Sequence, residues 1–493
     1  VYVPNAPLDP IPSGNDSCDS CDAPLSGEPL VRTKTDVEGK FVLEDMPVGD
    51  DIPLVIQSGK WRRMITIPTV TACVDTPLAA NLTRFPRTQG EFGVIENNIP
   101  KIALTTGGAD ALECLVRKIG IADSQFTNPA GTGRVNLYAG VGGTDRYKAG
   151  LNGGASFPNA STLWDDVADL DDYDMVVLSC EGAQDDPGNR PAGSYQNMKD
   201  YVDEHSGRVF GSHWHHAWVE NGPTPWPDIA TENHRDDMPI PNTVNINQTF
   251  NKGAALAQWL VNVMASTTLG ELVLNAGQHT IAAVNPAYAT TWVSGVNPDP
   301  DHDVDNEPAE DAVSYYSFNA PAEEADPDLQ CGKMVVTDIH VSNTDDSATN
   351  IRFPDVDDGG DPDGCTSTSL LPEEKALIFL LFDLASCVNS DTNECMPREC
   401  ADVDAECGPI ADGCGDLVDC GPCEEPGDTC GGGGTPNQCG NDGCVETTCE
   451  AENAECGPIA DGCGDTIDCG DCDPPQTCGG GGVANECGGN GVD

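Results

Sequence analysis

The sequence has few basic residues, few aromatic residues and no long apolar run. It contains 23 Lys and Arg against 82 Asp and Glu, which gives a formal net charge of −59. A charge of this sign and size repels phosphate backbones, which argues against nucleic acid as a partner. The longest apolar stretch, Ala376 to Leu384, is interrupted by Asp383. It is shorter than the roughly 20 residues needed to cross a bilayer, so we expect no transmembrane segment.

Aromatic residues and histidine are absent from the last part of the chain, which instead holds most of the cysteines. From residue 391 onward there is no Phe, Tyr or Trp, and no histidine follows His340. Sixteen of the 24 cysteines lie here in two sets of eight, offset by 49 residues in their first six members and by 48 in their last two. The strings AECGPIADGCGD and TCGGGG both occur twice. We therefore expect two Cys-rich repeats, at 391–440 and 441–493.

Such a repeat cannot bury enough apolar area to offset the entropy of its chain. We expect disulfides to supply the stability, at roughly 2–4 kcal/mol each, and hence a secreted or outer-surface protein from an oxidising compartment. The alternative is zinc at the Cys-x2-Cys pairs that begin at Cys420 and Cys469, but zinc sites need reduced thiolates and usually recruit histidine. The cysteines predicted to form disulfides are Cys395, Cys400, Cys407, Cys414, Cys420, Cys423, Cys430, Cys439, Cys444, Cys449, Cys456, Cys463, Cys469, Cys472, Cys478 and Cys487.

The N-terminal region alternates apolar and polar residues in the manner of β-strands. We expect strands at 30–35, 40–43, 52–56 and 61–67, separated by turns. The string TKTDVEGKFVLEDMPVG lies within this region. It resembles the carboxypeptidase regulatory-like domain, with its T-D-x-x-G-x-F pattern followed by a P-x-G turn. The resemblance implies an all-β sandwich over residues 1–90 with an accessory or adhesive role and no catalysis.

The central region alternates predicted strands with predicted helices. We expect strands at 101–106, 134–138, 173–179, 208–211, 313–318 and 331–340, with helices at 110–119, 198–204 and 376–384. The run Tyr173–Ser179 is apolar almost throughout, as is typical of a strand in a parallel sheet. Alternating β and α elements predict an α/β domain with a doubly wound sheet.

Three strings in this region carry a second resemblance: LDDYDMVVLSCEG, RVFGSHWHHAW and CGKMVVTDIH. They are similar to segments of the class I glutamine amidotransferase-like superfamily, and most of all to its ThuA-like branch. The resemblance spans 96–390 and implies a doubly wound, flavodoxin-like domain. Amidotransferases of the superfamily carry a catalytic Cys on an elbow after the strand that matches 208–211. Here Ser212 and His213 stand at that place, so we expect no glutaminase.

Cysteine and histidine gather near the predicted strand ends. Cys180 follows one strand, and we expect it in a disulfide, with Cys114 as one partner, in preference to a role as nucleophile. His213 and His215 would project to the same side of an extended segment and could bind a metal. The third ligand would be His340, Asp338 or Glu181. The neighbouring tryptophans, which would line a pocket suited to sugars, are Trp214, Trp218, Trp226 and Trp292.

Two acidic segments place carboxylates at alternating positions, which suits the hard oxygen ligands of Ca²⁺. Neither has the spacing of an EF-hand, so the alternative is a solvated acidic loop. Calcium is the only cofactor that we expect. The candidate ligands are Asp299, Asp301, Asp303, Asp305, Asp355, Asp357 and Asp361.

The sequence thus predicts a multidomain protein: an all-β sandwich, an α/β domain and disulfide-rich repeats with little regular structure. The favoured function is a secreted or cell-surface structural or adhesive protein with a catalytically degenerate amidotransferase-like domain. Its expected partners are further copies of itself, as an extracellular polymer, or surface glycans. The alternative is a metal-dependent or carbohydrate-directed hydrolase centred on His213 and His215. The sequence leaves enzymatic activity undecided and favours its absence.

Overall fold

The computed structural model shows a mainly β-sheet protein with several sheets and a disulfide-rich C-terminal region. Its described residues leave out 15–17, 19–24, 45, 184–189, 192, 236–237, 299–308, 342–351, 355–364, 366–368, 387–399, 401–404, 412–416, 424–427, 431–436, 441–446, 453, 461–465, 473–475, 479–484 and 489–493. The chain divides into two compact units, of which the first comprises 1–247 and 255–390 and the second 248–254 and 391–493. Within the described ranges, no helix has the length and apolar character needed to cross a bilayer.

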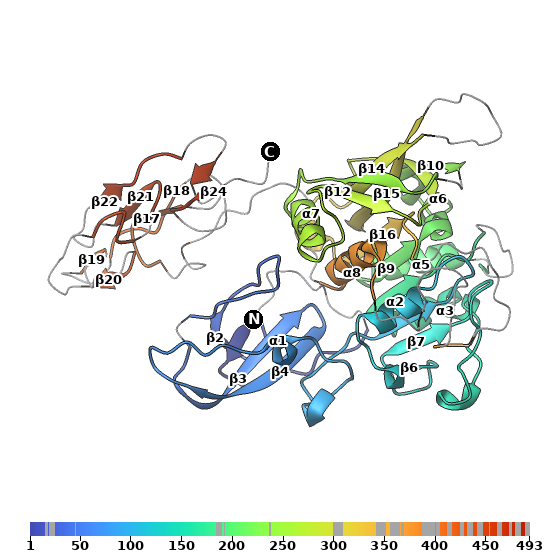
Figure 1. Ribbon diagram of the computed structural model, residues 1–493, viewed down its shortest axis with the longest axis horizontal. Coiled ribbons are helices and arrows are strands. Elements are labelled where there is room, and N and C mark those ends of the chain that lie inside the picture. The colour runs from blue at the N-terminus through green and yellow to red at the C-terminus, as the bar shows by residue number, and fades with distance from the viewer. Residues whose placement is uncertain are drawn as a thin grey trace. The chain divides into compact units, whose positions relative to one another are not determined.

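The N-terminal part of the first unit is one antiparallel sheet (Figure 1). Its strands, in spatial order, are β2 (Pro29–Arg32), β1 (Tyr2–Pro4), β3 (Gly49–Ser58) and β4 (Trp61–Val70). Val3, Leu54 and Ile67 pack in its apolar core. The strands predicted at 52–56 and 61–67 are confirmed, whereas 40–43 lies in no strand. The second sheet that a sandwich requires is not found among the described residues of 1–90.

The central part of the first unit is built on a ten-stranded mixed sheet. Six neighbouring strands are parallel: β16 (Gly332–Thr337), β9 (Arg208–Ser212), β8 (Met175–Leu178), β5 (Ile102–Thr105), β7 (Val135–Tyr138) and β6 (Phe126–Thr127). Four antiparallel strands continue the sheet beyond β16: β15 (Glu310–Ala320), β14 (Thr290–Asn297), β11 (Asn242–Ile246) and β12 (Glu271–Leu274). A separate pair is formed by β10 (Ala230–Arg235) and β13 (His279–Val284). The predicted strands of this region are confirmed, but the sheet is mixed and not wholly parallel.

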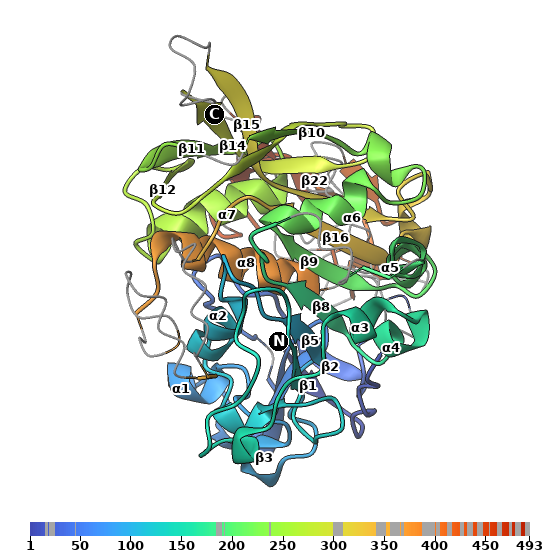
Figure 2. The ribbon, with the colours of Figure 1, turned by 90° about the vertical axis from the view of Figure 1, so that its right-hand side faces the viewer.

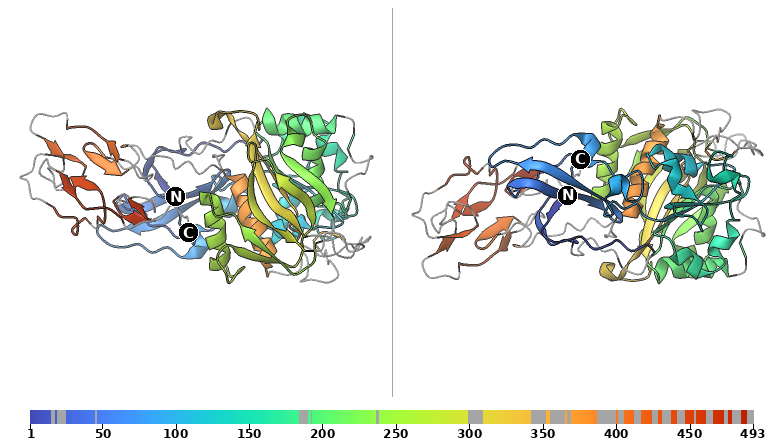
Figure 3. Two further views of the ribbon diagram at one scale, coloured as in Figure 1. Left: turned by 90° about the horizontal axis from the view of Figure 1, so that it is seen from above. Right: turned by 90° about the horizontal axis from the view of Figure 1, so that it is seen from below.

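Helices cover both faces of the central sheet (Figures 2 and 3). They are α2 (Leu112–Lys118), α3 (Ser161–Trp164), α4 (Val167–Asp171), α5 (Ser194–Asp203), α6 (Ala217–Glu220), α7 (Asn251–Asn262) and α8 (Pro372–Ala385). Leu163, Met198 and Trp218 bring α3, α5 and α6 onto Val176 and Val336 of the sheet in one apolar core. The helices predicted at 110–119, 198–204 and 376–384 are confirmed as α2, α5 and α8.

A buried ion pair connects the N-terminal sheet with the central domain. Lys60 Nζ lies 2.8 Å from Asp174 Oδ1, and the two side chains are 10% and 2% exposed. The ring of Trp61 also lies 5.4 Å from that of Phe382 on α8. The short helix α1 (Ala80–Thr83) follows β4 in this region. The N-terminal sheet therefore shares its packing with the central domain, in agreement with their membership of one compact unit.

The tail consists of small hairpins held by disulfides (Figure 1). The first repeat pairs β17 (Pro409–Ala411) with β18 (Leu417–Asp419) and β19 (Thr429–Cys430) with β20 (Cys439–Gly440), and the second pairs β21 (Pro458–Ala460) with β22 (Thr466–Asp468) and β23 (Thr477–Cys478) with β24 (Cys487–Gly488). The bonds of the first repeat are Cys400–Cys420, Cys407–Cys430 and Cys423–Cys439, and those of the second are Cys449–Cys469, Cys456–Cys478 and Cys472–Cys487. The two repeats thus share one connectivity, and the disulfide prediction is confirmed for these twelve cysteines. Cys395, Cys414, Cys444 and Cys463 lie outside the described residues.

The disulfides overturn the zinc alternative for the tail. Cys420 and Cys423, the pair with zinc-ligand spacing, bond to two different partners, Cys400 and Cys439. With two bonds in the first unit, Cys18–Cys331 and Cys114–Cys365, the described residues hold eight disulfides. This content fits an extracellular protein from an oxidising compartment.

Candidate functional site

Three polar side chains meet where three neighbouring parallel strands end. Cys180 follows β8, His213 follows β9, and His340 follows β16. The carboxyl ends of parallel strands lie at one edge of a sheet, which is where ligand sites of α/β folds form. Cys180 is fully buried, and His213 and His340 are each 3% exposed. We call these three residues the thiol–imidazole cluster.

The cluster is compact. Cys180 Sγ lies 3.3 Å from His213 Nδ1, and the rings of His213 and His340 are 5.0 Å apart between centroids. One ligand atom from each residue lies within 4.8 Å of the other two. A sulfur and two imidazole nitrogens at this spacing could bind one metal ion. The structure therefore brings together two of the predicted ligands, His213 and His340, with a cysteine that had been expected in a disulfide.

Close backbone packing holds Cys180 in place. The turn after β5 approaches Cys180 so closely that a Cβ atom on Gly107 would lie 2.0 Å from the Cys180 carbonyl oxygen. Only glycine permits this approach. Ala109, two residues later, donates its backbone N–H to the same carbonyl. The Gly107-Gly108 turn, which follows the first predicted strand, thus fixes the end of β8 against the end of β5.

His213 is the first residue after β9. Its φ of 42° is left-handed, which is uncommon for a residue with a side chain and is found often at functional sites. Ser212, just before it, donates its hydroxyl to Asp110 Oδ2 at 2.7 Å. Asp110 Oδ1 accepts the backbone N–H of Val341. Asp110 therefore ties the end of β9 to the segment that carries His340.

His215 does not join the cluster. Trp218 donates its indole N–H to His215 Nδ1, and His215 Nε2 donates to the carbonyl of Ser179. Both ring nitrogens are thus engaged. The prediction assumed an extended segment, whereas residues 213–216 form a 3-10 helix, η4 (His213–His216). With about three residues per turn, positions i and i+2 point in different directions, so the expected His213–His215 pairing is wrong.

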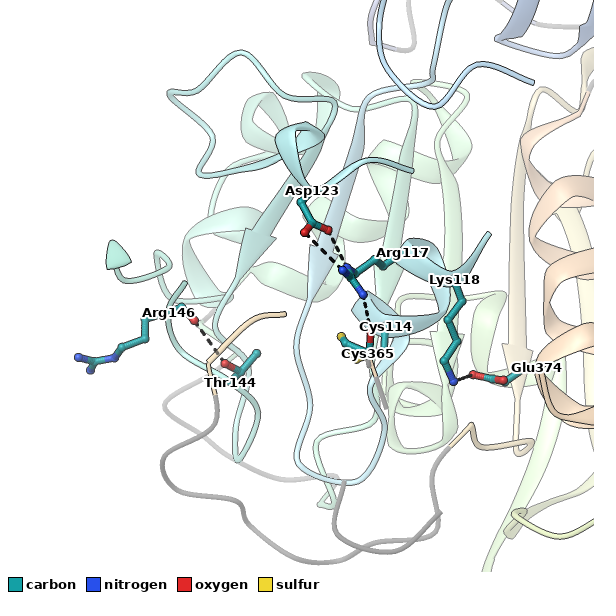
Figure 4. The surroundings of a disulfide bond; sticks show 8 residues. All are labelled: Cys114, Arg117, Lys118, Asp123, Thr144, Arg146, Cys365 and Glu374. Carbon is teal, nitrogen blue, oxygen red and sulfur yellow. Dashed lines mark hydrogen bonds and ion pairs between the residues drawn. A yellow bond between two sulfur atoms is a disulfide. The ribbon is translucent and has the colours of Figure 1, made fainter. Parts of the chain in front are cut away.

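The expected disulfide of Cys180 is also wrong. Cys114 bonds to Cys365, and Cys180 is a free, buried thiol. Figure 4 shows the surroundings of the Cys114–Cys365 bond, where Arg117 donates to the Cys365 carbonyl and Lys118 pairs with Glu374 at 2.6 Å. The bond and these two contacts therefore anchor α2. Cys73, which is exposed, is the other free cysteine that the described residues contain.

Burial favours the uncharged forms of Cys180, His213 and the neighbouring Asp110. It raises the pKa of the Cys180 thiol, which disfavours a thiolate nucleophile. It lowers the pKa of His213 well below its ordinary value, with His340 nearby as a second cause. It raises the pKa of Asp110, while His340 acts on that carboxyl in the opposite direction. The arrangement is thus poor in charge and closed to solvent.

The other predicted site residues lie elsewhere. Asp338 Oδ2 accepts the backbone N–H groups of Thr280 and Ile281, and Glu181 Oε1 accepts that of Val141. Three of the four tryptophans expected to line a sugar pocket, Trp218, Trp226 and Trp292, are fully buried in the core. They are therefore unavailable for stacking on a sugar. The seven aspartates proposed as calcium ligands lie outside the described residues.

Sequence reasoning missed Asp110 and the place of Cys180 in the cluster. Both lie directly after a predicted strand, Asp110 beyond the Gly107-Gly108 turn and Cys180 after the third strand. That position is the signal that could have identified Asp110, whereas for Cys180 the sequence shows the same signal but favours a disulfide. Comparisons of the chain with protein-family models, with curated proteins and with solved structures find no match.

Proposed function

We propose that the chain is a secreted or cell-surface structural or adhesive protein whose central domain has an amidotransferase-like fold without glutaminase activity. The observation that carries this proposal is the closure of the site. Cys180 and Ser212 are fully buried, and the elbow residue is an imidazole with 3% exposure. A glutaminase needs a reactive thiolate that a substrate can reach. The buried, protonated thiol meets neither condition.

The strand order supports the fold part of the proposal. Numbered along the chain from β5, with β6 and β7 together as the second position, the parallel strands run 2-1-3-4-5 across the sheet. This is the order of flavodoxin-like folds. In such folds ligands bind at the carboxyl ends of the strands, where Cys180, His213 and His340 lie. The four antiparallel strands beyond β16 are an addition to that order.

The tail and the surface charge support an extracellular structural role. Six disulfides in the described tail stabilise its fold, and a stably folded tail is cut slowly by proteases. The net charge of −59 keeps the chain hydrated and could collect divalent cations between copies. Self-association and binding to surface glycans are the two proposed interactions, with Ca²⁺ at the acidic segments 299–307 and 355–363 as the proposed cofactor.

A metal-dependent hydrolase is the second candidate. The observation that favours it is that His213 and His340 lie together beside Cys180. In this version His215 has no role as a ligand, because both of its ring nitrogens are hydrogen-bonded. A metal ion with an open coordination position would activate water at the strand ends.

The test joins an activity screen with an assembly measurement. The full chain and its Cys180→Ala variant are assayed on glutamine and on glycan, ester and amide substrates, with half-buried His205→Ala, outside the cluster, as the control. We expect no turnover by any of them. Glutamine hydrolysis that disappears in Cys180→Ala would refute the proposal, and hydrolysis of another substrate that disappears would favour the second candidate.

Assembly is measured by sedimentation velocity at rising protein concentration, with chelator and with millimolar Ca²⁺. We expect larger species at higher concentration, and more of them with Ca²⁺. A monomer under all conditions that also binds no glycan would remove the structural and adhesive role.

A further inference from the structure

The thiol–imidazole cluster has nearly the dimensions of a metal site. Bonds of about 2.3 Å to sulfur and 2.0–2.1 Å to nitrogen place the ligand atoms of tetrahedral zinc roughly 3.3–3.6 Å apart. Cys180 Sγ and His213 Nδ1 are 3.3 Å apart, and no pair of ligand atoms in the cluster exceeds 4.8 Å. A shift of about 1 Å in one side chain would complete the geometry. The three residues come from three adjacent strand ends, so the sheet itself sets their spacing.

The backbone around Cys180 suits a metal-bound thiolate. The backbone N–H of Gly182 donates to Cys180 Sγ, which is the outer hydrogen bonding that stabilises such a ligand. Zinc binds one nitrogen of an imidazole, and Nδ1 of His213 is the nitrogen that faces the Cys180 sulfur. The neighbouring His215 is no competing ligand, because both of its ring nitrogens are hydrogen-bonded.

The charge around the cluster suits a divalent cation. A zinc ion bound to one thiolate and two neutral imidazoles leaves one net positive charge. Asp110 interacts electrostatically with His340, so its carboxylate can balance that charge. Zinc binding would release the thiol proton of Cys180 to solvent. The same cation would favour the ionised form of Asp110, which burial alone disfavours.

We propose that Cys180, His213 and His340 bind one zinc ion in the central domain. A thiolate with two imidazoles is a ligand set that zinc favours over Ca²⁺ and Mg²⁺, which take oxygen ligands. The site also accounts for a free thiol in a chain whose other described cysteines, except Cys73, form disulfides. The inference does not rest on the structural role proposed above. A protein without zinc would leave the assembly test unchanged, and it would remove zinc chemistry from the hydrolase named as the second candidate.

The test uses the full chain, produced in zinc-supplemented medium and dialysed briefly against chelator to clear the acidic surface. Zinc is counted by mass spectrometry in the wild type, in Cys180→Ala and in His340→Ala. Cys73→Ser, which removes the exposed free thiol, is the matched control. We expect one zinc per chain in the wild type and the control, and a content lower by about tenfold or more in the two cluster variants. Asp110→Asn should retain zinc but lose it about 10–100-fold more readily to chelator.

Cobalt provides a readout that does not depend on the variants' folding. The wild type produced with Co²⁺ should show the near-ultraviolet band of a thiolate bound to cobalt, since Cys180 is the ligand. Absence of that band, or absence of zinc from the wild type, would overturn the proposal. Equal zinc in wild type and Cys180→Ala would also overturn it, because the metal would then be bound at another place.

Discussion

The disulfide-rich tail and the central sheet are stabilised by different forces. The described residues of the tail form six disulfides, and only three of them are buried and apolar: Cys407, Cys456 and Ile459. The central domain packs a large apolar core between sheet and helices and carries the Cys114–Cys365 bond on α2. Crosslinks act mainly on the unfolded chain, whereas burial acts on the folded one. The two regions should therefore respond to different treatments.

Reduction of the disulfides should give the largest difference in stability between the tail and the central domain. Each described tail bond closes a loop of 15–23 residues, and a loop of that size contributes about 3 kcal/mol. The three described bonds of each repeat then exceed what so small an apolar core can replace. We expect reduced tail to be cut rapidly by protease while the central domain persists. Limited proteolysis with mass spectrometry, before and after reductant, measures this.

All seven tryptophans lie before residue 391, so their emission monitors the first unit separately. It should change little under reductant at low denaturant. If most tail cysteines react with alkylating reagent before any reduction, the described disulfides are wrong.

The central elements could be predicted from the sequence because each is marked by a local pattern. The apolar run at 173–179 is β8, and the run at 376–384 lies in α8, since continuous apolar stretches have to be buried. The tail could be predicted as repeats because duplicated cysteines and a lack of aromatics are visible without any structure. Its connectivity could not, since pairing depends on the path of the chain.

The site could be predicted only in part. His213 and His340 were expected near strand ends, and they meet there. The failure concerned His215, because one turn of 3-10 helix after β9 changes its direction, and no sequence period marks so short a turn. The pairing of Cys114 with Cys365, 251 residues away, also depends on the tertiary fold.

The second prediction uses pH, to which the crosslinked tail should be much less sensitive than the core. Glu113 on α2 is 1% exposed, and its Oε2 has no hydrogen-bond partner within the described ranges. Burial raises the pKa of Glu113 to about 8, from 4.5. Between about pH 4.5 and pH 8 the folded state thus holds a proton on Glu113 that the unfolded chain has already released. Stability from the neutral carboxyl is full below about pH 4.5, falls by about 1.4 kcal/mol per pH unit, and stops falling above about pH 8.

Glu113→Gln should remove that loss. We expect wild type and variant to have similar free energies of unfolding near pH 4.5, and the variant to be the more stable by several kcal/mol at pH 8. The measurement is urea unfolding by tryptophan emission across this range. The two proteins are compared at each pH because other groups also change the free energy of unfolding. Buried His213, whose pKa is lowered, makes stability rise with pH below about pH 6.5, which is opposite to the effect of Glu113. Parallel stability curves for the two proteins would contradict the prediction.

The smallest expected effect compares the two repeats of the tail with each other. The backbone N–H of Cys439 donates to Glu406 Oε2 at 3.0 Å, and that of Cys487 donates to Glu455 Oε2 at the same distance. Glu406→Ala and Glu455→Ala should each remove one such bond, worth about 0.5–1.5 kcal/mol, and leave the disulfides intact. We expect the amide of the facing cysteine to exchange with solvent roughly 2- to 12-fold faster in each variant, with exposed Glu450→Ala as the control. Both repeats have the same disulfide connectivity and the same Glu-to-Cys hydrogen bond, so the two effects should be equal. Faster exchange in only one repeat would show that the repeats are equivalent in their disulfides alone.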